Sequence, residues 1–292
     1  FIADQLVPVL GVSKQSDIYF KTNHFLNRQY VPDLTQRAPG TAARKIGYAV
    51  SSDTYYAKNY ALADDWPVED EVNADEALQW ASLKATNLMD RLMIDYEMRI
   101  AGIANSATNV HTTINVATPY SNRGSRPMDE LSDTIEAFRQ ATGERPNTIV
   151  IPEQIAQKLR TNDQIRDQLF GDRGGVATDQ QIASLLKIDR ILVPELLVNT
   201  FGTGETLLNS VALSNAWGNF IHLAKISPLP GRQVDTWLQA FRWTSPLFGS
   251  PFAVQRYPFD PVKKAYGIEV SYYQAEKVIA TDLCWRLNSL IP

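Results

Sequence analysis

The strongest constraint on the fold is a long amphipathic pattern that begins near residue 73. Apolar residues recur there at spacings of three and four, which is the repeat of one face of an α-helix. These residues are Leu78, Ala81, Ala85, Leu88, Leu92, Tyr96, Ile100 and Ile103. Asn73 and Glu76 resemble a capping box and predict the start of the helix. A helix of about 30 residues spans about 45 Å, and its heptad is not strict. The pattern therefore favours the spine of a flat, elongated domain over a lone coiled coil.

The residues before this helix form two segments that need another surface to bury them. Residues 1–14 are apolar and are interrupted by a proline and a glycine, which predicts an extended arm. Residues 17–26 and 44–50 alternate apolar and polar side chains, as half-buried strands do. We interpret residues 15–64 as a long β-hairpin with an irregular tip. A two-stranded hairpin is at most marginally stable by itself, so a neighbour must cover it.

Charge is segregated along this part of the chain. Between residues 17 and 60 there are six basic and three acidic residues, a net charge of +3. Between residues 64 and 76 there are seven acidic residues and no basic residue. The acidic run fits a solvated linker that also favours the positive end of the next helix. A contact with a basic hairpin from another subunit is the second interpretation. A calcium loop is disfavoured because the carboxylates lack its spacing and its glycine.

Residues 127–229 alternate helix and strand patterns, which predicts a compact α/β unit. Pro127 is suited to the first turn of a helix and Gly143 to its end, and Thr178 can cap another helix. Residues 163–175 are polar, so we expect a loop there. From residue 230 onward, strand patterns with many aromatic side chains dominate, as in a core or an interface.

The sequence contains no recognisable catalytic motif. It lacks a phosphate-binding glycine loop with lysine, a nucleophile elbow and a paired-histidine zinc motif. Its three histidines, His24, His111 and His222, are scattered along the chain. Cys284 lies among apolar residues, as a buried structural thiol does. We therefore expect no catalytic residue, no metal and no cofactor.

Composition excludes further classes of function. The 292 residues are 44% hydrophobic, which is enough for a sizeable core. A net charge of −4 disfavours a protein that binds tightly to nucleic-acid phosphates. No apolar run approaches the ~20 residues that a membrane helix needs. With a single cysteine the chain has no intrachain disulfide, so we expect a soluble protein from a reducing compartment.

Several short segments and the order of the elements resemble one family. The segments are RAPGT (37–41), GYAVS (47–51), DTYY (53–56), YALA (60–63), VNAD (72–75), VSYY (270–273) and EKV (276–278). The order is arm, hairpin, acidic segment, spine helix, α/β unit and terminal β run. Together they resemble the major capsid proteins of tailed bacteriophages, which have the Hong Kong 97-type fold. The resemblance covers nearly the whole chain, and its specificity comes from the number and order of the segments.

The resemblance implies an α+β subunit with four parts. They are an N-terminal arm at 1–14, an extended hairpin loop at 15–64, a peripheral domain at 65–126 and 230–292, and an axial domain at 127–229. It also implies that copies join as hexamers and pentamers in a closed icosahedral shell around double-stranded DNA. Such a shell is part of the virion and assembles in the cytoplasm of the host bacterium.

We expect three groups of residues at the contacts between subunits. The hairpin group is Arg37, Pro39, Gly40, Arg44 and Lys45. The acidic group is Asp64, Asp65, Glu69, Asp70 and Glu71. The axial group, in a loop that points toward the five- or six-fold axis, is Arg166, Asp167, Asp172 and Arg173. Head-to-tail contacts around a ring suit opposite charges on one subunit.

The resemblance further implies partners and leaves two alternatives open. Portal, scaffold and decoration proteins are implied partners, packaged DNA is implied to make weak non-specific contacts, and no membrane is involved. Bacterial compartment shells share the fold, so the enclosed cargo is protein in the first alternative. A soluble enzyme with an unrecognised site is the second, because catalytic residues converge in space rather than in sequence.

Overall fold

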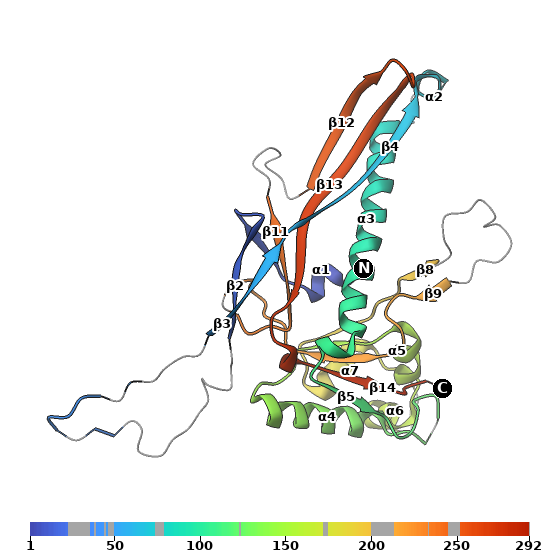
Figure 1. Ribbon diagram of the computed structural model, residues 1–292. Coiled ribbons are helices and arrows are strands. Elements are labelled where there is room, and N and C mark those ends of the chain that lie inside the picture. Colours follow the sequence, from blue (N-terminus) through green and yellow to red (C-terminus); the bar gives the residue numbers. More distant parts are fainter. Residues whose placement is uncertain are drawn as a thin grey trace.

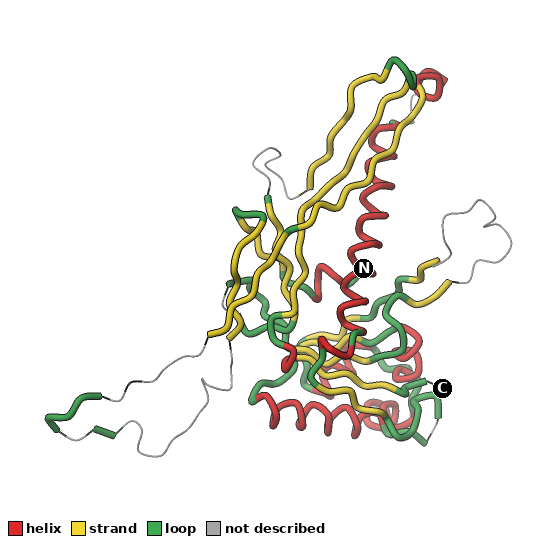
Figure 2. The backbone as a smooth tube through the Cα atoms, viewed as in Figure 1, coloured by secondary structure: helices red, strands yellow, loops and turns green. Residues whose placement is uncertain are grey.

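The computed structural model shows an elongated subunit in which one long helix joins an α/β unit to an extended sheet (Figure 1, Figure 2). It describes residues 1–22, 36–37, 39–43, 45, 50–73, 79–122, 124–171, 175–199, 213–232, 234–244 and 252–291. Helices and strands are mixed along the chain, in agreement with the α+β class.

The extended part of the subunit is a five-stranded sheet with β13 at its centre. Its order is β1-β11-β13-β12, and β4 pairs with the other edge of β13. The strands are β1 (Val9–Val12), β4 (Lys58–Pro67), β11 (Leu238–Trp243), β12 (Phe252–Asp260) and β13 (Ala265–Val278). Because β13 has 14 residues, it pairs with β12 along its first part and with β11 along its last part.

The helix α3 (Trp80–Asn105) runs along this sheet and buries its apolar face against it. Leu88 and Leu92 lie in the shared core, as their spacing predicts. Their buried neighbours are Trp66, Ile268, Val270 and Tyr272. The sheet residues come from β4 and β13, so the helix is held by two strands that are distant in the sequence.

The predicted start of this helix is wrong. Asn73 is the last residue of a separate short helix, α2 (Val68–Asn73), and α3 follows Gln79, whose side chain makes no capping hydrogen bond. A capping box is a pattern of only four residues, whereas the pairing of β4 with β13 as far as Pro67 decides where the chain turns. Glu76 lies outside the described residues.

The N-terminal arm packs against β11 and α3 of its own chain, so it needs no neighbouring molecule to cover it. It forms α1 (Ala3–Leu6) and then β1, which runs parallel to β11. Glu97 is fully buried on α3 and accepts the backbone N–H groups of Ile2 at 3.0 Å and Ala3 at 2.7 Å. It also accepts the indole N–H of Trp217 at 2.8 Å. The arm needs a surface, as expected, but its own subunit supplies that surface.

The α/β unit is built on a second five-stranded sheet with the order β5-β14-β10-β6-β7. The strands are β5 (Thr112–Asn115), β6 (Thr148–Val150), β7 (Arg190–Leu192), β10 (Ile221–Ala224) and β14 (Cys284–Asn288). The helices are α4 (Pro127–Thr142), α5 (Glu153–Arg160), α6 (Asp163–Phe170), α7 (Asp179–Leu186) and the 3-10 helices η2 (Ala107–Asn109) and η4 (Thr281–Leu283). Gly143 ends α4 at a φ of 70°, and Thr178 with Gln181 forms the capping box of α7.

The two sheets do not follow the expected domain limits. β5 and β14 belong to the sheet of the α/β unit, although the sequence assigns 65–126 and 230–292 to the peripheral domain. β4 likewise continues past residue 64 without interruption. Periodicity identifies strands but not their partners, because sheets join residues that are far apart in the sequence.

Residues 163–175 are not the polar loop that the sequence predicts, since α6 occupies their first part. The side chain of Asn162 accepts the backbone N–H of Gln164 and caps this helix. Ile165 is fully buried, and Leu169 packs against the same core. This apolar pair at positions i and i+4 is the signal for the helix.

Two ribbons of two strands lie beside the two five-stranded sheets (Figure 1). β2 (Ser16–Thr22) pairs antiparallel with β3 (Val50–Tyr56), and β8 (Leu197–Asn199) pairs with β9 (Leu213–Asn215). The first ribbon is the base of the predicted hairpin. Its return strand begins at residue 50, while most of the predicted strand at 44–50 lies outside the described residues.

The end of α3 meets the α/β sheet at a fully buried histidine. His222 of β10 places Nε2 3.1 Å from the carbonyl oxygen of Ala104, in the last turn of α3. Its ring stacks on Trp237, with ring centres 6.2 Å apart. Burial lowers the pKa of His222 to about 4, so the ring is neutral near pH 7.

Truncation of the helix face tests the shared core of α3 and the extended sheet. Leu88→Ala should lower the free energy of unfolding by about 2–5 kcal/mol, because it removes buried methyl groups and leaves a cavity. Leu83→Ala on the same helix is the matched control, since Leu83 is 43% exposed, and it should cost less than about 0.5 kcal/mol. Urea unfolding measures both values. Equal losses would mean that the helix face is misassigned.

Acidification tests the buried histidine. Because the folded-state pKa of His222 is about 4 and its ordinary value is 6.5, the unfolded chain takes up the proton first as the pH falls. The stability that neutral His222 contributes is present above pH 6.5 and is lost as the pH falls toward 4. The loss is about 3 kcal/mol at 1.36 kcal/mol per pH unit. Urea unfolding between pH 7.5 and 4 should show this slope, and His222→Phe should lack it. The same slope in both proteins would contradict the assignment.

Candidate functional site

The acidic segment is part of the folded subunit rather than a solvated linker. Asp64 and Asp65 lie on β4, and Glu69 and Asp70 lie exposed on α2, beyond the end of that strand (Figure 1). Trp66 is the signal that the linker interpretation missed, because this residue between the acids is buried against α3. A strand that buries a tryptophan is held in place by packing, whatever the charge of its neighbours.

Two of the expected contact acids have partners within the chain. Asp64 accepts a hydrogen bond from the ammonium group of Lys84 on α3 at 2.6 Å. Asp65 forms an ion pair with Lys263, in the turn between β12 and β13, at 3.0 Å. Glu71 is helical, but its side chain lies outside the described residues. Glu69 and Asp70 are therefore the described acids of this group that remain open to a neighbour.

The hairpin group is only partly described. Arg37, Pro39, Gly40 and Lys45 are exposed, and Gly40 has a φ of 80°, a conformation that favours glycine. Arg44 lies outside the described residues, as do most residues around this group. The contact of this group with another subunit stays a prediction.

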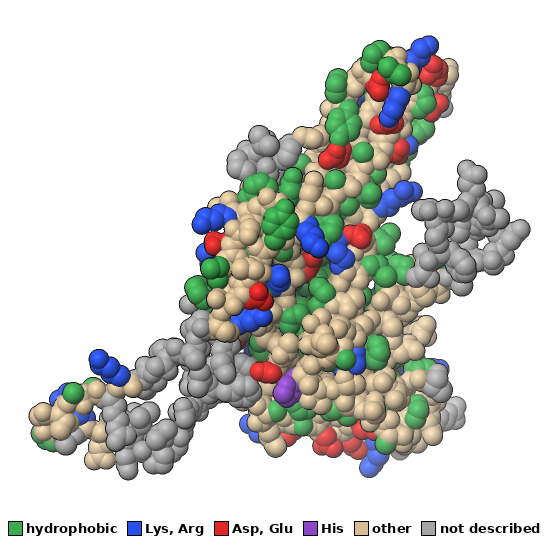
Figure 3. Space-filling view, viewed as in Figure 1, with side chains coloured by type: hydrophobic (Ala, Val, Ile, Leu, Met, Phe, Trp, Pro, Cys, Tyr) green, Lys and Arg blue, Asp and Glu red, His purple; other side chains and the backbone are tan. Residues whose placement is uncertain are grey.

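The base of the hairpin carries an exposed apolar face that the sequence analysis missed. Ile18, Phe20 and Tyr56 share the outer face of the β2–β3 ribbon and are 49%, 38% and 58% exposed. On the inner face, Tyr55 stacks on Phe241 with ring centres 4.5 Å apart. The run Ile18-Tyr19-Phe20 in β2 is the sequence signal for this arrangement, because successive side chains of a strand point to opposite faces and consecutive apolar residues therefore reach both. Figure 3 shows apolar side chains reaching the surface among charged ones along the extended sheet.

Asp53 and Lys21 tie the two strands of this ribbon together. The ammonium group of Lys21 lies 2.9 Å from the carboxylate of Asp53, and Tyr19 donates its hydroxyl to the same carboxylate at 3.1 Å. The hydrogen bond from Lys21 lowers the pKa of Asp53 to about 2. The carboxylate is therefore charged at any pH well above 2, and its two contacts link β2 to β3.

The axial group is divided between a helix and residues that the structure does not describe. Arg166 and Asp167 lie on α6, whereas Asp172 and Arg173 lie outside the described residues. Arg166 donates to the carbonyl oxygen of Gly175 at 2.9 Å and lies 3.5 Å from the carboxylate of Asp163. These contacts hold the end of the segment against its own helix.

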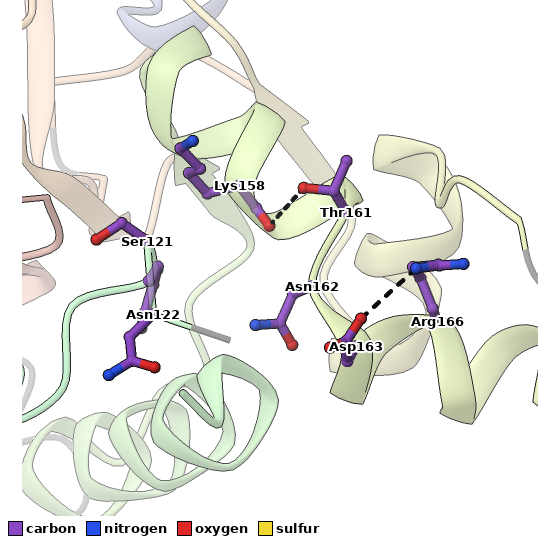
Figure 4. A pocket seen from close by; sticks show the side chains of 8 residues that line it. Ser121, Asn122, Lys158, Thr161, Asn162, Asp163 and Arg166 are labelled. Carbon is purple, nitrogen blue, oxygen red and sulfur yellow. Dashed lines mark hydrogen bonds and ion pairs between the residues drawn. The ribbon is translucent and has the colours of Figure 1, made fainter. Parts of the chain in front are cut away.

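A polar pocket of about 320 Å³ opens beside this helix (Figure 4). Arg166 and Asp163 form one wall, and Ser121 and Asn122 lie on the other side. Lys158 adds a further cationic group. Hydroxyl, amide and charged groups of this kind can hydrogen-bond to a polar surface. The lining contains neither histidine nor cysteine.

The described histidine and cysteine side chains lie in different environments. Nδ1 of His111 lies 3.2 Å from the carboxylate of Asp282 at the surface, His222 is buried, and His24 lies outside the described residues. Cys284 is fully buried, and burial raises the pKa of its thiol. Within the described ranges no group of three or more histidine, cysteine or acidic residues is arranged to hold a metal ion. In the same ranges no helix is long and apolar enough to cross a membrane.

Comparison with known proteins agrees with the resemblance in sequence. No family model matches the chain. The major capsid protein of Burkholderia phage BcepMu is 21% identical over 257 residues, which covers 86% of this chain and 80% of that protein. The match therefore extends over most of both sequences.

Solved structures share the fold at low identity. A phage-related protein from Bordetella bronchiseptica RB50 matches with a TM-score of 0.73 and 17% identity, over 99% of this chain and 91% of the other. The capsid of cyanophage P-SCSP1u matches with a TM-score of 0.61 and 14% identity, over 97% and 86%. An encapsulin complex from Synechococcus elongatus PCC 7942 matches with a TM-score of 0.50 and 11% identity, over 97% and 85%. The chain thus has the Hong Kong 97-type fold of phage capsids and is a distant relative of a phage major capsid protein.

Proposed function

We propose that the chain is the major structural subunit of a tailed-phage head. Its copies form hexamers and pentamers that close into an icosahedral shell around the double-stranded DNA genome. The observation that carries this proposal is the match to a phage major capsid protein over 86% of the chain. The elongated subunit, with its two-stranded ribbons, supports it, because such a shape gains burial from copies of itself.

The contacts between copies follow from the exposed parts of the subunit. The basic hairpin of one copy lies over the extended sheet of its neighbour, so that Arg37, Arg44 and Lys45 approach Glu69 and Asp70 on α2. The apolar outer face of the β2–β3 ribbon continues the same contact. The segment with Arg166, Asp167, Asp172 and Arg173 lies toward the five- or six-fold axis, where its alternating charges limit repulsion between copies. The arm, extended loop, peripheral domain and axial domain then take the roles that the resemblance implies.

The role of the subunit is structural rather than enzymatic. Its partners are other copies of the chain, with portal, scaffold and decoration proteins as further partners of the shell. DNA is held by weak, non-specific contacts, which a net charge of −4 supports, because a strongly basic lining binds phosphates tightly. The protein is part of the virion after assembly in the host cytoplasm.

A bacterial compartment shell with protein cargo is the second candidate, supported by the encapsulin likeness. Electron microscopy of the purified protein and analysis of the shell contents separate the two. We expect closed shells, and nuclease-resistant DNA inside those recovered from phage-producing cells. Shells that contain a specific protein and no DNA would favour the compartment. Uniform small particles under every assembly condition would contradict both candidates.

Replacement of residues 29–42 by a short glycine-rich turn tests the hairpin contact. The subunit should keep a cooperative melt, because its described cores lie elsewhere, but it should stop at monomers or small rings. Closed shells from this variant would contradict the hairpin contact. A subunit that fails to fold would contradict it too, because the hairpin would then be needed for folding rather than for assembly.

Charge variants of the hairpin provide a matched comparison. Arg37→Glu with Lys45→Glu should slow assembly most at low salt, whereas Arg37→Lys with Lys45→Arg should assemble like the wild type. An exposed ion pair contributes only ~0–1 kcal/mol, so the effect depends on repetition and weakens as salt screens it. Light scattering at several salt concentrations measures the rates.

A further inference from the structure

The C-terminus of α3 ends on two side chains of the α/β sheet. The last carbonyl groups of a helix have no hydrogen-bond partner inside the helix, so other groups must supply one. The carbonyl oxygen of Ala104 lies 3.1 Å from Nε2 of His222, and that of Asn105 accepts Nη1 of Arg286 at 2.6 Å. Two consecutive carbonyl groups are thus held by donors from another unit.

The two donors are paired with each other in the sheet. His222 of β10 lies directly opposite Arg286 of β14 in their antiparallel register, so both side chains leave the same face. Their Cβ atoms are then about 4.5–5.5 Å apart. A helix that rotates about its axis or tilts would present other carbonyl groups to this pair. The two hydrogen bonds therefore form only when the helix axis has one orientation relative to the sheet.

The buried charge of Arg286 makes it costly to move the C-terminus of α3 away from this site. Arg286 is 8% exposed, and none of the described carboxylates forms an ion pair with it. It also donates to the hydroxyl of Thr113 at 3.0 Å and lies over the ring of Phe220, 4.5 Å from its centre. A buried charge without a counter-charge is costly, and a helix C-terminus carries about half a negative charge. The end of α3 therefore compensates the guanidinium, and displacement of the helix removes that compensation.

The direction of α3 affects where the extended sheet lies relative to the α/β unit. The helix has 26 residues, which corresponds to about 39 Å. Leu88 and Leu92, in its first half, carry the extended sheet. A tilt of about 10° at the C-terminus displaces the other end of such a helix by about 7 Å. The contact of α3 with His222 and Arg286 therefore helps to fix the angle between the extended sheet and the α/β unit, together with the buried core that the two units share.

We propose that His222 and Arg286 form a directional clamp on the C-terminal carbonyl groups of α3, which sets the angle between the two units and, through it, the curvature of the shell. The curvature rests on the proposed function, whereas the angle belongs to the subunit alone. Each subunit of a shell touches its neighbours through both units, so the angle within one subunit determines the angle between neighbours.

Distances between spin labels measure the angle in the isolated subunit. Labels on Asn87→Cys in α3 and Gln154→Cys in α5 report it, because both positions are exposed, while native Cys284 is fully buried and does not react. We expect one narrow distance distribution for the wild type. His222→Phe and Arg286→Met replace each donor by an apolar side chain of similar size. Each variant should therefore shift or broaden the distance distribution by several ångström. Unchanged distributions in both variants would overturn the clamp.

A matched control separates the clamp from a general loss of sheet stability. Arg190 lies on β7 of the same sheet and donates to the hydroxyl of Thr148, within the sheet. Arg190→Met should leave the label distances unchanged. If the clamp variants lose their cooperative melt, Arg286→Lys and His222→Gln replace them, since each keeps one donor. They should give a smaller broadening, and wild-type distributions in these variants would also overturn the clamp.

Electron microscopy of assembled shells tests the curvature. The clamp variants should give mixed diameters or open sheets, and Arg190→Met should give the wild-type diameter. Shells of wild-type diameter, made from subunits whose label distances have changed, would overturn the role in curvature. If the wild type itself forms no shell, the proposed function fails, and the label distances still decide the clamp.

Discussion

The fold depends on burying one face of a helix that is longer than any single surface beside it. α3 has 26 residues, and three parts of the chain cover it in turn. The extended sheet covers Leu88 and Leu92, the N-terminal arm closes over Glu97, and the α/β sheet receives the last carbonyl groups. These surfaces come from both ends of the sequence. Helices in proteins gain most of their stability from tertiary packing. The apolar face of α3 is therefore fully covered only when nearly the whole chain is folded.

A cluster of aromatic and charged side chains joins α3 to the extended sheet. Arg99 stacks on the ring of Tyr60 in β4, 3.6 Å from its centre. Its guanidinium also donates to the hydroxyl of Tyr272 at 2.8 Å and to the carboxylate of Glu276 at 3.0 Å, both on β13. The planar, multi-donor group suits such a site because it bonds in several directions at once. One side chain thus connects the helix to two strands of the extended sheet.

Local, periodic features of this protein could be predicted from the sequence, and features that depend on distant residues could not. The buried face at Leu88 and the cap at Thr178 are decided within a few residues, and both are confirmed. α6 was missed because most of its residues are polar and only Ile165 and Leu169 show the helical spacing. The docking of the arm depends on Glu97, which is 94 residues from its partner Ala3 and looks like a surface residue in the helical pattern. The acidic segment was misread for the same reason, since its partners on α3 and β13 are distant in sequence.

Strong contacts inside the subunit and weak contacts on its surface suit a protein that folds first and assembles afterwards. Inside, Glu97 accepts hydrogen bonds from three donor groups, and the last carbonyl groups of α3 accept hydrogen bonds from His222 and Arg286. Opening these sites leaves buried polar groups without a partner, which costs about 1–3 kcal/mol for each group. Outside, the described part of the ribbon offers Ile18, Phe20 and Tyr56 as an apolar face, and exposed ion pairs add ~0–1 kcal/mol each. A larger apolar face would promote aggregation of free subunits. Weak contacts let a misplaced subunit leave before a ring closes, and closed symmetry then repeats the same weak contact in every copy. In the proposed shell, stability therefore comes from repetition, and the shape that makes repetition possible comes from the buried contacts of α3.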